Sequence, residues 1–112
     1  MKVVILTSRR PNIWKPRLIE DAAALGWDVT RLPDTTSDWR IARACQDADL
    51  LLWLFTRGRR PGGDALAMLQ RVQDAGTRTA GVHLVLYWGL RRREHRIGAS
   101  PWWSCQTVFT AD

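Results

Sequence analysis

Arginine is the residue type in this sequence whose spacing is most suited to chemistry, because it recurs in groups that each follow an apolar run. The groups follow residues 2–7, 48–55 and 77–86. Their members are Arg9 and Arg10; Arg57, Arg59 and Arg60; and Arg91, Arg92, Arg93 and Arg96. A guanidinium group presents a planar fork of donors that can bind phosphate or carboxylate through two hydrogen bonds at once. The three groups therefore predict a binding site for an anionic ligand.

Aromatic side chains and a histidine accompany these groups. Trp14 follows the first group, Tyr87 and Trp88 precede the third, and His83 lies in the apolar run before them. His83 has two interpretations that stay open: a base or hydrogen-bond donor to a ligand at the floor of a crevice, or a core histidine bonded to the backbone. No catalytic residue is assigned. The predicted ligand-binding residues are Arg9, Arg10, Trp14, Arg57, Arg59, His83, Tyr87, Trp88, Arg91 and Arg92.

Several signatures of enzymes and metal sites are missing from the sequence. No G-x-G-x-x-G motif follows the first apolar run and no G-x-x-x-x-G-K-[ST] motif occurs, so neither classical dinucleotide binding nor a P-loop is supported. His83 and His95 do not have the spacing of a zinc site. Cys45 and Cys105 also fit no metal spacing, and we interpret both as ordinary free thiols. No metal is expected.

Composition indicates one globular domain over residues 1–112, with 46% apolar residues. The 17 basic residues outnumber the 11 acidic ones and give a net charge of +6. This balance favours anionic partners, whether phosphorylated small molecules, nucleic acid or an acidic protein surface, without choosing among them. Fifteen of the 17 basic residues are arginine, which a GC-rich genome would also produce. The sequence has no signal peptide and no long apolar span, so we expect a cytoplasmic protein with reduced thiols and no membrane span.

Hydrophobic patterning predicts five strands, over residues 2–7, 27–32, 48–55, 77–86 and 106–110. Helical patterns lie between the first four, and Gly26 and Gly76 are suitable helix stops. A short turn or helix is expected over 101–104. The run 48–55 is the most apolar and should be the central strand. The run 27–32 alternates apolar and polar residues, which suits a partly exposed strand or an edge strand.

This order of elements predicts an α/β fold, a Rossmann-like three-layer α/β/α domain with a five-stranded parallel sheet of order 3-2-1-4-5. The carboxyl ends of parallel strands meet at one edge of a sheet, where ligands bind. All three arginine groups should therefore gather at that edge. The opposite edge receives the turns around Gly26, Asp47, Asp49 and Gly76, which are acidic or neutral.

The sequence also resembles a known family. The runs M-K-V-V-I-L-T, A-D-L-L-L-W-L-F, G-V-H-L-V-L-Y-W-G-L, I-G-A-S-P-W-W and V-F-T-A-D resemble the amino-terminal half of bacterial and phage-type glycosyltransferases of the GT-B fold. The resemblance spans residues 1–112 and is most specific over 83–90, 98–103 and 108–112. It implies a domain that holds the glycosyl acceptor, with the nucleotide-sugar donor held by a second half beyond Asp112. No cofactor is then expected in this chain, and no sugar transfer by the chain alone.

Two alternatives from other classes remain. The chain could be a stand-alone basic module for nucleic acid or an acidic protein, since arginines beside Trp14, Tyr87 and Trp88 could follow a phosphate backbone and stack bases. It could also be an interaction domain that self-associates or binds a protein partner through aromatic side chains. The candidates for that surface are Tyr87, Trp88, Trp102 and Trp103.

Overall fold

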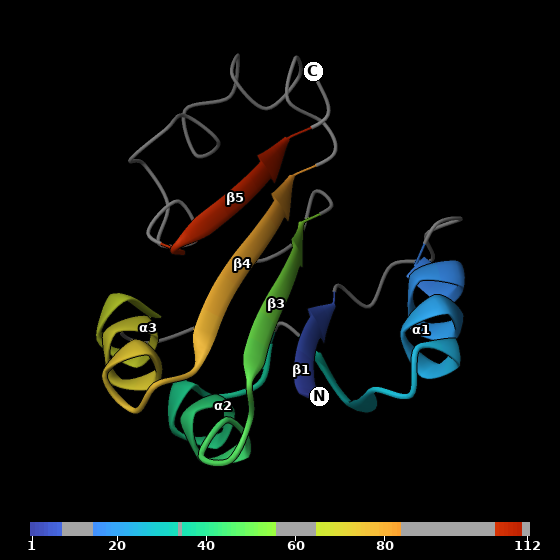
Figure 1. Cartoon of the computed structure of the whole chain (residues 1–112). Helices are drawn as coiled ribbons and strands as arrows, with labels where there is room; N and C mark the ends of the chain where they lie inside the picture. Colours follow the sequence, from blue (N-terminus) through green and yellow to red (C-terminus); the bar gives the residue numbers. More distant parts are fainter. Residues whose placement is uncertain (8–14, 34, 56–64, 84–104, 111–112) are drawn as a thin grey trace.

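The computed structural model describes residues 1–7, 15–33, 35–55, 65–83 and 105–110 (Figure 1). For Lys15, Pro16, Phe55, Ala65, His83 and Thr110 the description covers the backbone alone. The elements are β1 (Lys2–Thr7), α1 (Lys15–Ala24), β2 (Asp28–Pro33), α2 (Asp38–Ala44), β3 (Leu50–Phe55), α3 (Ala65–Asp74), β4 (Arg78–His83) and β5 (Thr107–Thr110). Each predicted strand is present, with bounds that differ from the predicted ones by a few residues.

All neighbouring strands pair in parallel, in the order β2-β1-β3-β4-β5. The predicted α/β class and five-stranded parallel sheet are confirmed, whereas the predicted order 3-2-1-4-5 is wrong. In that order β3 would be an edge strand and β2 an interior one. The residues of β3 are apolar on both faces, and such a strand is stable only where both faces are covered. The observed order gives β3 an interior position and leaves the half-polar β2 at the edge.

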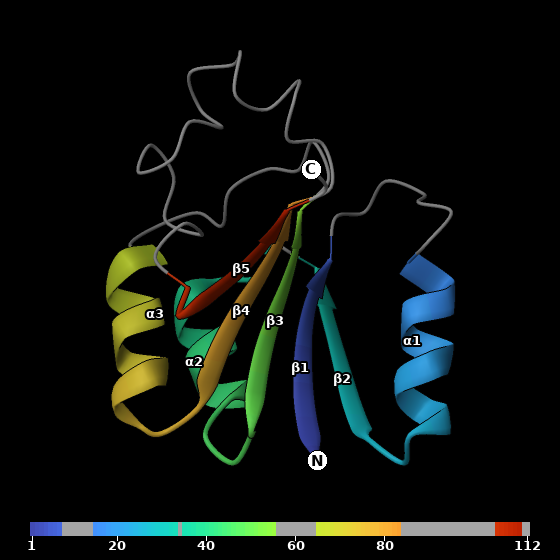
Figure 2. The same ribbon diagram turned by 45° about the horizontal axis from the view of Figure 1, so that its top comes forward.

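Helices lie on both sides of the sheet, with α1 on one side and α2 and α3 on the other (Figures 1 and 2). On the first side, Leu18 and Ile19 of α1 pack near Val3 and Ile5 of β1. On the other side, α2 and α3 lie next to each other. The two faces of the sheet therefore have separate cores, which we call the α1 face and the α2/α3 face.

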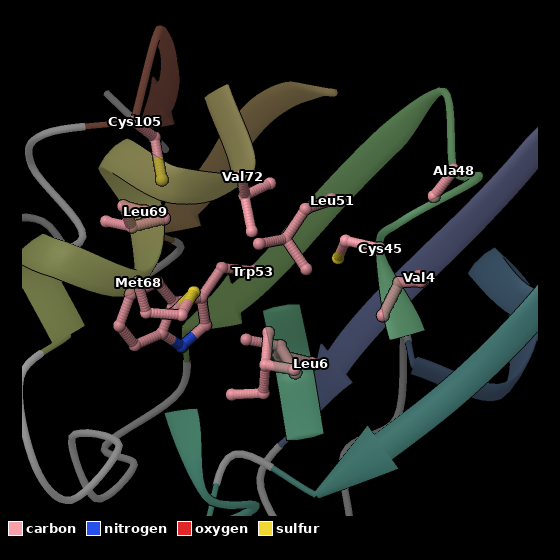
Figure 3. Packing of buried hydrophobic residues seen from close by; sticks show 11 residues of the cluster. Val4, Leu6, Cys45, Ala48, Leu51, Trp53, Met68, Leu69, Val72 and Cys105 are labelled. Carbon is pink, nitrogen blue, oxygen red and sulfur yellow. The ribbon is translucent and has the colours of Figure 1, made fainter. Parts of the chain in front are cut away.

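The α2/α3 face holds the larger core. Met68 and Leu69 of α3 gather with Leu51 and Trp53 of β3, and Trp53 is fully buried (Figure 3). Ile41 of α2 is fully buried in the same cluster. The remaining buried members are Val4, Leu6, Cys45, Ala48, Val72 and Cys105. These residues come from two strands, two helices and the turns before β3 and β5, so this cluster holds most of the fold together.

Two glycines and a threonine fix the turns between helices and strands. Gly26 and Gly76 follow α1 and α3 with φ of 78° and 94°, a left-handed conformation that glycine adopts without strain. Both were predicted as helix stops, and this is confirmed. Thr77 is buried, and its hydroxyl donates to the carbonyl oxygens of Cys45 and Ala48, each at 3.0 Å. This contact ties the start of β4 to the turn between α2 and β3.

Candidate functional site

The carboxyl edge of the sheet is where β1, β3 and β4 end side by side. Phe55 of β3 is in register with His83 of β4, and His83 with Thr110 of β5. On the other side of β3, Trp53 is in register with Leu6 of β1, so these strands end at the same level of the sheet. The backbone of His83 thus lies at this edge, as predicted, as the last residue of β4. Its side chain lies outside the description.

The observed strand order brings the starting points of the three arginine groups together. Each group follows one of β1, β3 and β4, and these three strands are consecutive neighbours in the sheet. In the predicted order, β2 and β1 would have separated β3 from β4. The other predicted site residues lie outside the described residues, so the positions of their side chains stay predictions. They are Arg9, Arg10, Trp14, Arg57, Arg59, Tyr87, Trp88, Arg91 and Arg92.

The junction of β1 and β3 is the point where the order of strands reverses. The chain leaves β1 for α1 on one face of the sheet, and it leaves β3 for α3 on the other face. A crevice outside the carboxyl ends of the strands forms at such a switch point in open parallel sheets, and ligands bind there. The first two arginine groups follow the two strands that flank this point. Sequence patterning missed it because the predicted order placed the reversal between β1 and β4.

Charge is distributed unevenly between these segments and the rest of the chain. Residues 8–14, 56–64 and 84–104 hold nine of the fifteen arginines and only two acidic residues, Asp64 and Glu94. The remaining residues hold eight basic and nine acidic side chains and are close to neutral. The net positive charge of the protein therefore comes from the segments that follow three adjacent carboxyl ends.

The amino edge of the sheet has a different character. The turns at Gly26, Asp47–Asp49 and Gly76 lead into strands here, as predicted. The carboxylate of Asp49 accepts a hydrogen bond from the backbone N–H of Lys2 at 2.8 Å and so joins β1 to the start of β3. An open hollow of about 580 Å³ lies beside it, lined by Met1, Asp49, Leu50, Gly76 and Arg78. One exposed arginine beside acidic side chains gives this edge no concentration of positive charge.

The cysteines are not candidates for nucleophilic chemistry. Both are free, as predicted, and both are buried. Burial raises the pKa of Cys45 to about 11 and that of Cys105 to about 12, the second despite a hydrogen bond with Thr79 that lowers it. Both thiols are therefore protonated at neutral pH, whereas the thiolate is the reactive form. In the part of the chain that is described, no group of histidine, cysteine and acidic residues could hold a metal ion.

No family model matches the chain, and no curated protein matches it. None of the described helices is long and apolar enough to cross a membrane. The argument for function therefore depends on the sheet edge and on the chemistry of the residues that follow it.

Proposed function

We propose that this protein is a binding domain for an anionic ligand, held at the carboxyl edge of the sheet around the junction of β1 and β3. The ligand carries phosphate or carboxylate groups, because guanidinium groups bind both through paired hydrogen bonds. The binding residues are Arg9, Arg10, Trp14, Arg57, Arg59, His83, Tyr87, Trp88, Arg91 and Arg92.

One observation carries the proposal: nine of the fifteen arginines follow the carboxyl ends of three consecutive parallel strands. Solvated surface arginines would have no reason to concentrate there. Positive charge concentrated at a cleft also attracts anions from solution and speeds their association.

The more specific form of the proposal is that the domain is the acceptor-side half of a glycosyltransferase. Its support is the resemblance in sequence, together with a parallel sheet whose carboxyl edge is the proposed ligand site. The strand order gives this form no support, because the predicted order was 3-2-1-4-5 and the observed order is β2-β1-β3-β4-β5. In this form the acceptor binds at the carboxyl edge, and the nucleotide-sugar donor would need a second half.

Titration with inorganic phosphate, followed through backbone amide shifts, tests the binding site. We expect the largest changes at the amides of Thr7, Phe55 and His83, and small ones at Asp28, Asp49 and Arg78 on the amino edge. Changes centred on the amino edge would contradict the proposal. The expected weakening in Arg9→Ser/Arg57→Ser is roughly tenfold or more, since each hydrogen bond to a charged group contributes about 1.5–3 kcal/mol.

The matched control is Arg40→Ser/Arg43→Ser, which removes the same charge from α2. Equal weakening by both double variants would show that only net charge matters, and the site would be abandoned. The glycosyltransferase form has its own test, because the purified 112-residue chain should transfer no sugar from a nucleotide-sugar donor. Measurable transfer would contradict that form while leaving the anion site intact.

The alternative of a nucleic-acid module is favoured by the aromatic residues within the same segments, Trp14, Tyr87 and Trp88. Binding that depends on phosphate contacts weakens steeply with salt because counterions are released. We expect weak, sequence-independent binding to DNA or RNA that is lost at moderate salt. Tight binding that survives moderate salt would favour the nucleic-acid module.

A further inference from the structure

The α1 face of the sheet is covered over only part of its width by the described helices. Val3 and Ile5 of β1 are fully buried beneath α1. Further along the same face, Leu50 and Leu52 of β3 and Val82 of β4 are only partly buried. The row Leu54, Val82 and Phe109 shows the trend, since these three residues are in register on β3, β4 and β5. Leu54 is buried, Val82 is half-buried, and Phe109 is 57% exposed.

Some of the exposed large apolar side chains lie on this part of the face or at the amino edge of the sheet. Five occur in the described segments: Met1, Leu25, Trp39, Leu66 and Phe109. Leu25, which is 67% exposed, directly follows α1 at the amino edge, and Met1 lines the hollow beside Leu50. Trp39 and Leu66 belong to α2 and α3 on the opposite face. Three of the five therefore lie around the α1 face or its amino edge.

The shape of this face is a step. A helix is about 10 Å across, so α1 stands about that far above the strands that it leaves uncovered. The low part is the apolar surface of β3, β4 and β5, and the high part is the outer side of α1. Two such steps fit each other across a two-fold axis parallel to the strands, with α1 of each copy over the low part of the other. The two helices then form one layer between two sheets, which covers both faces of each sheet.

We propose that a second copy of this chain binds the α1 face in this way, as a symmetric dimer. A two-fold axis parallel to the strands keeps the amino edges of both copies at the same level. It therefore brings Leu25 of one copy to the hollow of the other, where Met1 and Leu50 lie beside Asp49, Gly76 and Arg78. Each contact occurs twice, as in any isologous interface.

Charge on the two parts of the step is complementary. The outer side of α1 carries the exposed Arg17 in its first turn and the exposed Glu20 and Asp21 nearer the amino edge. The low part carries the exposed Arg78 at the first position of β4. Glu20, Asp21 and Arg78 make no ion pair within the described part of the chain. Because α1 runs from the carboxyl edge to the amino edge, Asp21 lies in the half of the helix that would approach Arg78 of the other copy. Ala23 and Ala24 follow on the helix and are small enough to allow close approach.

Sedimentation equilibrium of the full chain tests the dimer. We expect a dimer for the wild type and at least tenfold weaker association for Leu25→Glu, which replaces an apolar contact with Met1 and Leu50 by a carboxylate beside Asp49. The matched control is Leu66→Glu, since Leu66 is 54% exposed on α3 and should lie outside the interface. A wild type that stays monomeric at its highest soluble concentration would overturn the proposal. So would equal weakening by both variants, or a dimer that Leu25→Glu leaves unchanged.

A charge exchange tests the orientation. Asp21→Arg and Arg78→Asp should each weaken the dimer, and the double variant should recover most of the lost affinity. Failure to recover would reject this arrangement of the two copies. Phe109→Ser is a second test of whether the α1 face forms the interface. It should weaken association without lowering the melting temperature of the monomer, whereas a destabilised monomer would mean that the chain itself covers Phe109. A dimer that only Trp88→Ala dissociates would assign the interface to the carboxyl edge instead.

Discussion

The two faces of the sheet are built from the same strands and yet are buried to different degrees. On the α2/α3 face, Leu51 and Trp53 of β3 are fully buried beneath two helices. On the α1 face, Leu50 and Leu52 of the same strand are only partly buried, near a single helix. Over residues 50–53 burial thus alternates, although the strand sequence, L-L-L-W-L-F, is apolar throughout. One helix covers about two strands, so α1, the helix described on this face, leaves part of a five-stranded sheet without a helix above it.

The difference assigns separate roles to the faces. The α2/α3 face contains the cluster that connects β1, β3, α2 and α3 with the turn before β5, and it accounts for most of the stability. The α1 face has a smaller buried cluster and an open apolar part. We therefore expect substitutions on the first face to unfold the protein, and substitutions on the open part of the second face to change association.

The largest effect is expected from Trp53→Ala on the α2/α3 face. Trp53 is fully buried, and replacing a buried tryptophan with alanine leaves a cavity that costs about 3–5 kcal/mol. Phe109→Ala on the open part of the α1 face should change the free energy of unfolding of the monomer by less than about 1 kcal/mol, because Phe109 is largely exposed. Urea unfolding of both variants measures the difference. Similar losses in the two variants would contradict the contrast between the faces.

Thr77→Val should have the next largest effect. The hydroxyl of Thr77 donates to two carbonyl oxygens in a buried turn, and valine keeps the shape while removing the donor. Leaving a buried acceptor unsatisfied costs about 1–3 kcal/mol. Thr107→Val on the exposed start of β5 is the control, for which we expect a change within about 0.5 kcal/mol. Equal effects in urea unfolding would show that the buried hydroxyl contributes nothing specific.

Much of the fold could be predicted from the sequence, because apolar runs of strand length alternate with helical patterns and glycines mark the helix ends. The strand order was the part that failed. The residues already contained the information, since the alternating run 27–32 suited an edge and the run 48–55 suited the centre. An order of 3-2-1-4-5 contradicts both features. Applying the burial of each strand before the connection rule would have selected 2-1-3-4-5.

The site could be predicted only to the level of the sheet edge. The position of His83 at the carboxyl end of β4 followed from the length of its apolar run, and this is confirmed for the backbone. Which side chains meet around a ligand depends on the path of segments 8–14, 56–64 and 84–104, which no periodicity determines. The uncovered part of the α1 face was also beyond the sequence, because a uniformly apolar strand does not show which of its faces has a helix above it.

Gln106→Ala should have a smaller effect, at the connection between β4 and β5. The side-chain carbonyl of Gln106 accepts a hydrogen bond from the backbone N–H of Thr79 at 3.1 Å. The backbone N–H of Gln106 donates to the Thr79 hydroxyl at 2.9 Å. The first bond is lost in the variant, for a cost of about 0.5–1.5 kcal/mol. Gln70→Ala removes an exposed bond to Asp74 four residues along α3 and should cost only about 0.2–0.5 kcal/mol. Equal costs in thermal unfolding would mean that β5 does not depend on this contact.

The last effect is absent at neutral pH and appears only in alkaline solution, and it reports on the α2/α3 face alone. Cys45 and Cys105 both belong to that core, where burial raises the pKa of each thiol from 9.0, to about 11 and about 12. Well below pH 9 the thiols are protonated in both the folded and the unfolded chain, so they add no pH dependence there. Above it the unfolded chain releases these protons while the folded chain keeps them, so stability must fall as pH rises.

The measurement is the free energy of unfolding in urea at several pH values from 8 upward, for the wild type and for Cys45→Ala/Cys105→Ala. Lysine and tyrosine also titrate in this range, and the double variant retains them, so the difference between the two curves isolates the thiols. The two curves should run parallel well below pH 9. As the pH approaches 9.0, where half of the unfolded thiols are ionised, the wild type should begin to fall more steeply. Parallel curves up to pH 11 would show that the cysteines are as open to water as in the unfolded chain. The core on the α2/α3 face would then exclude water no better than the α1 face does.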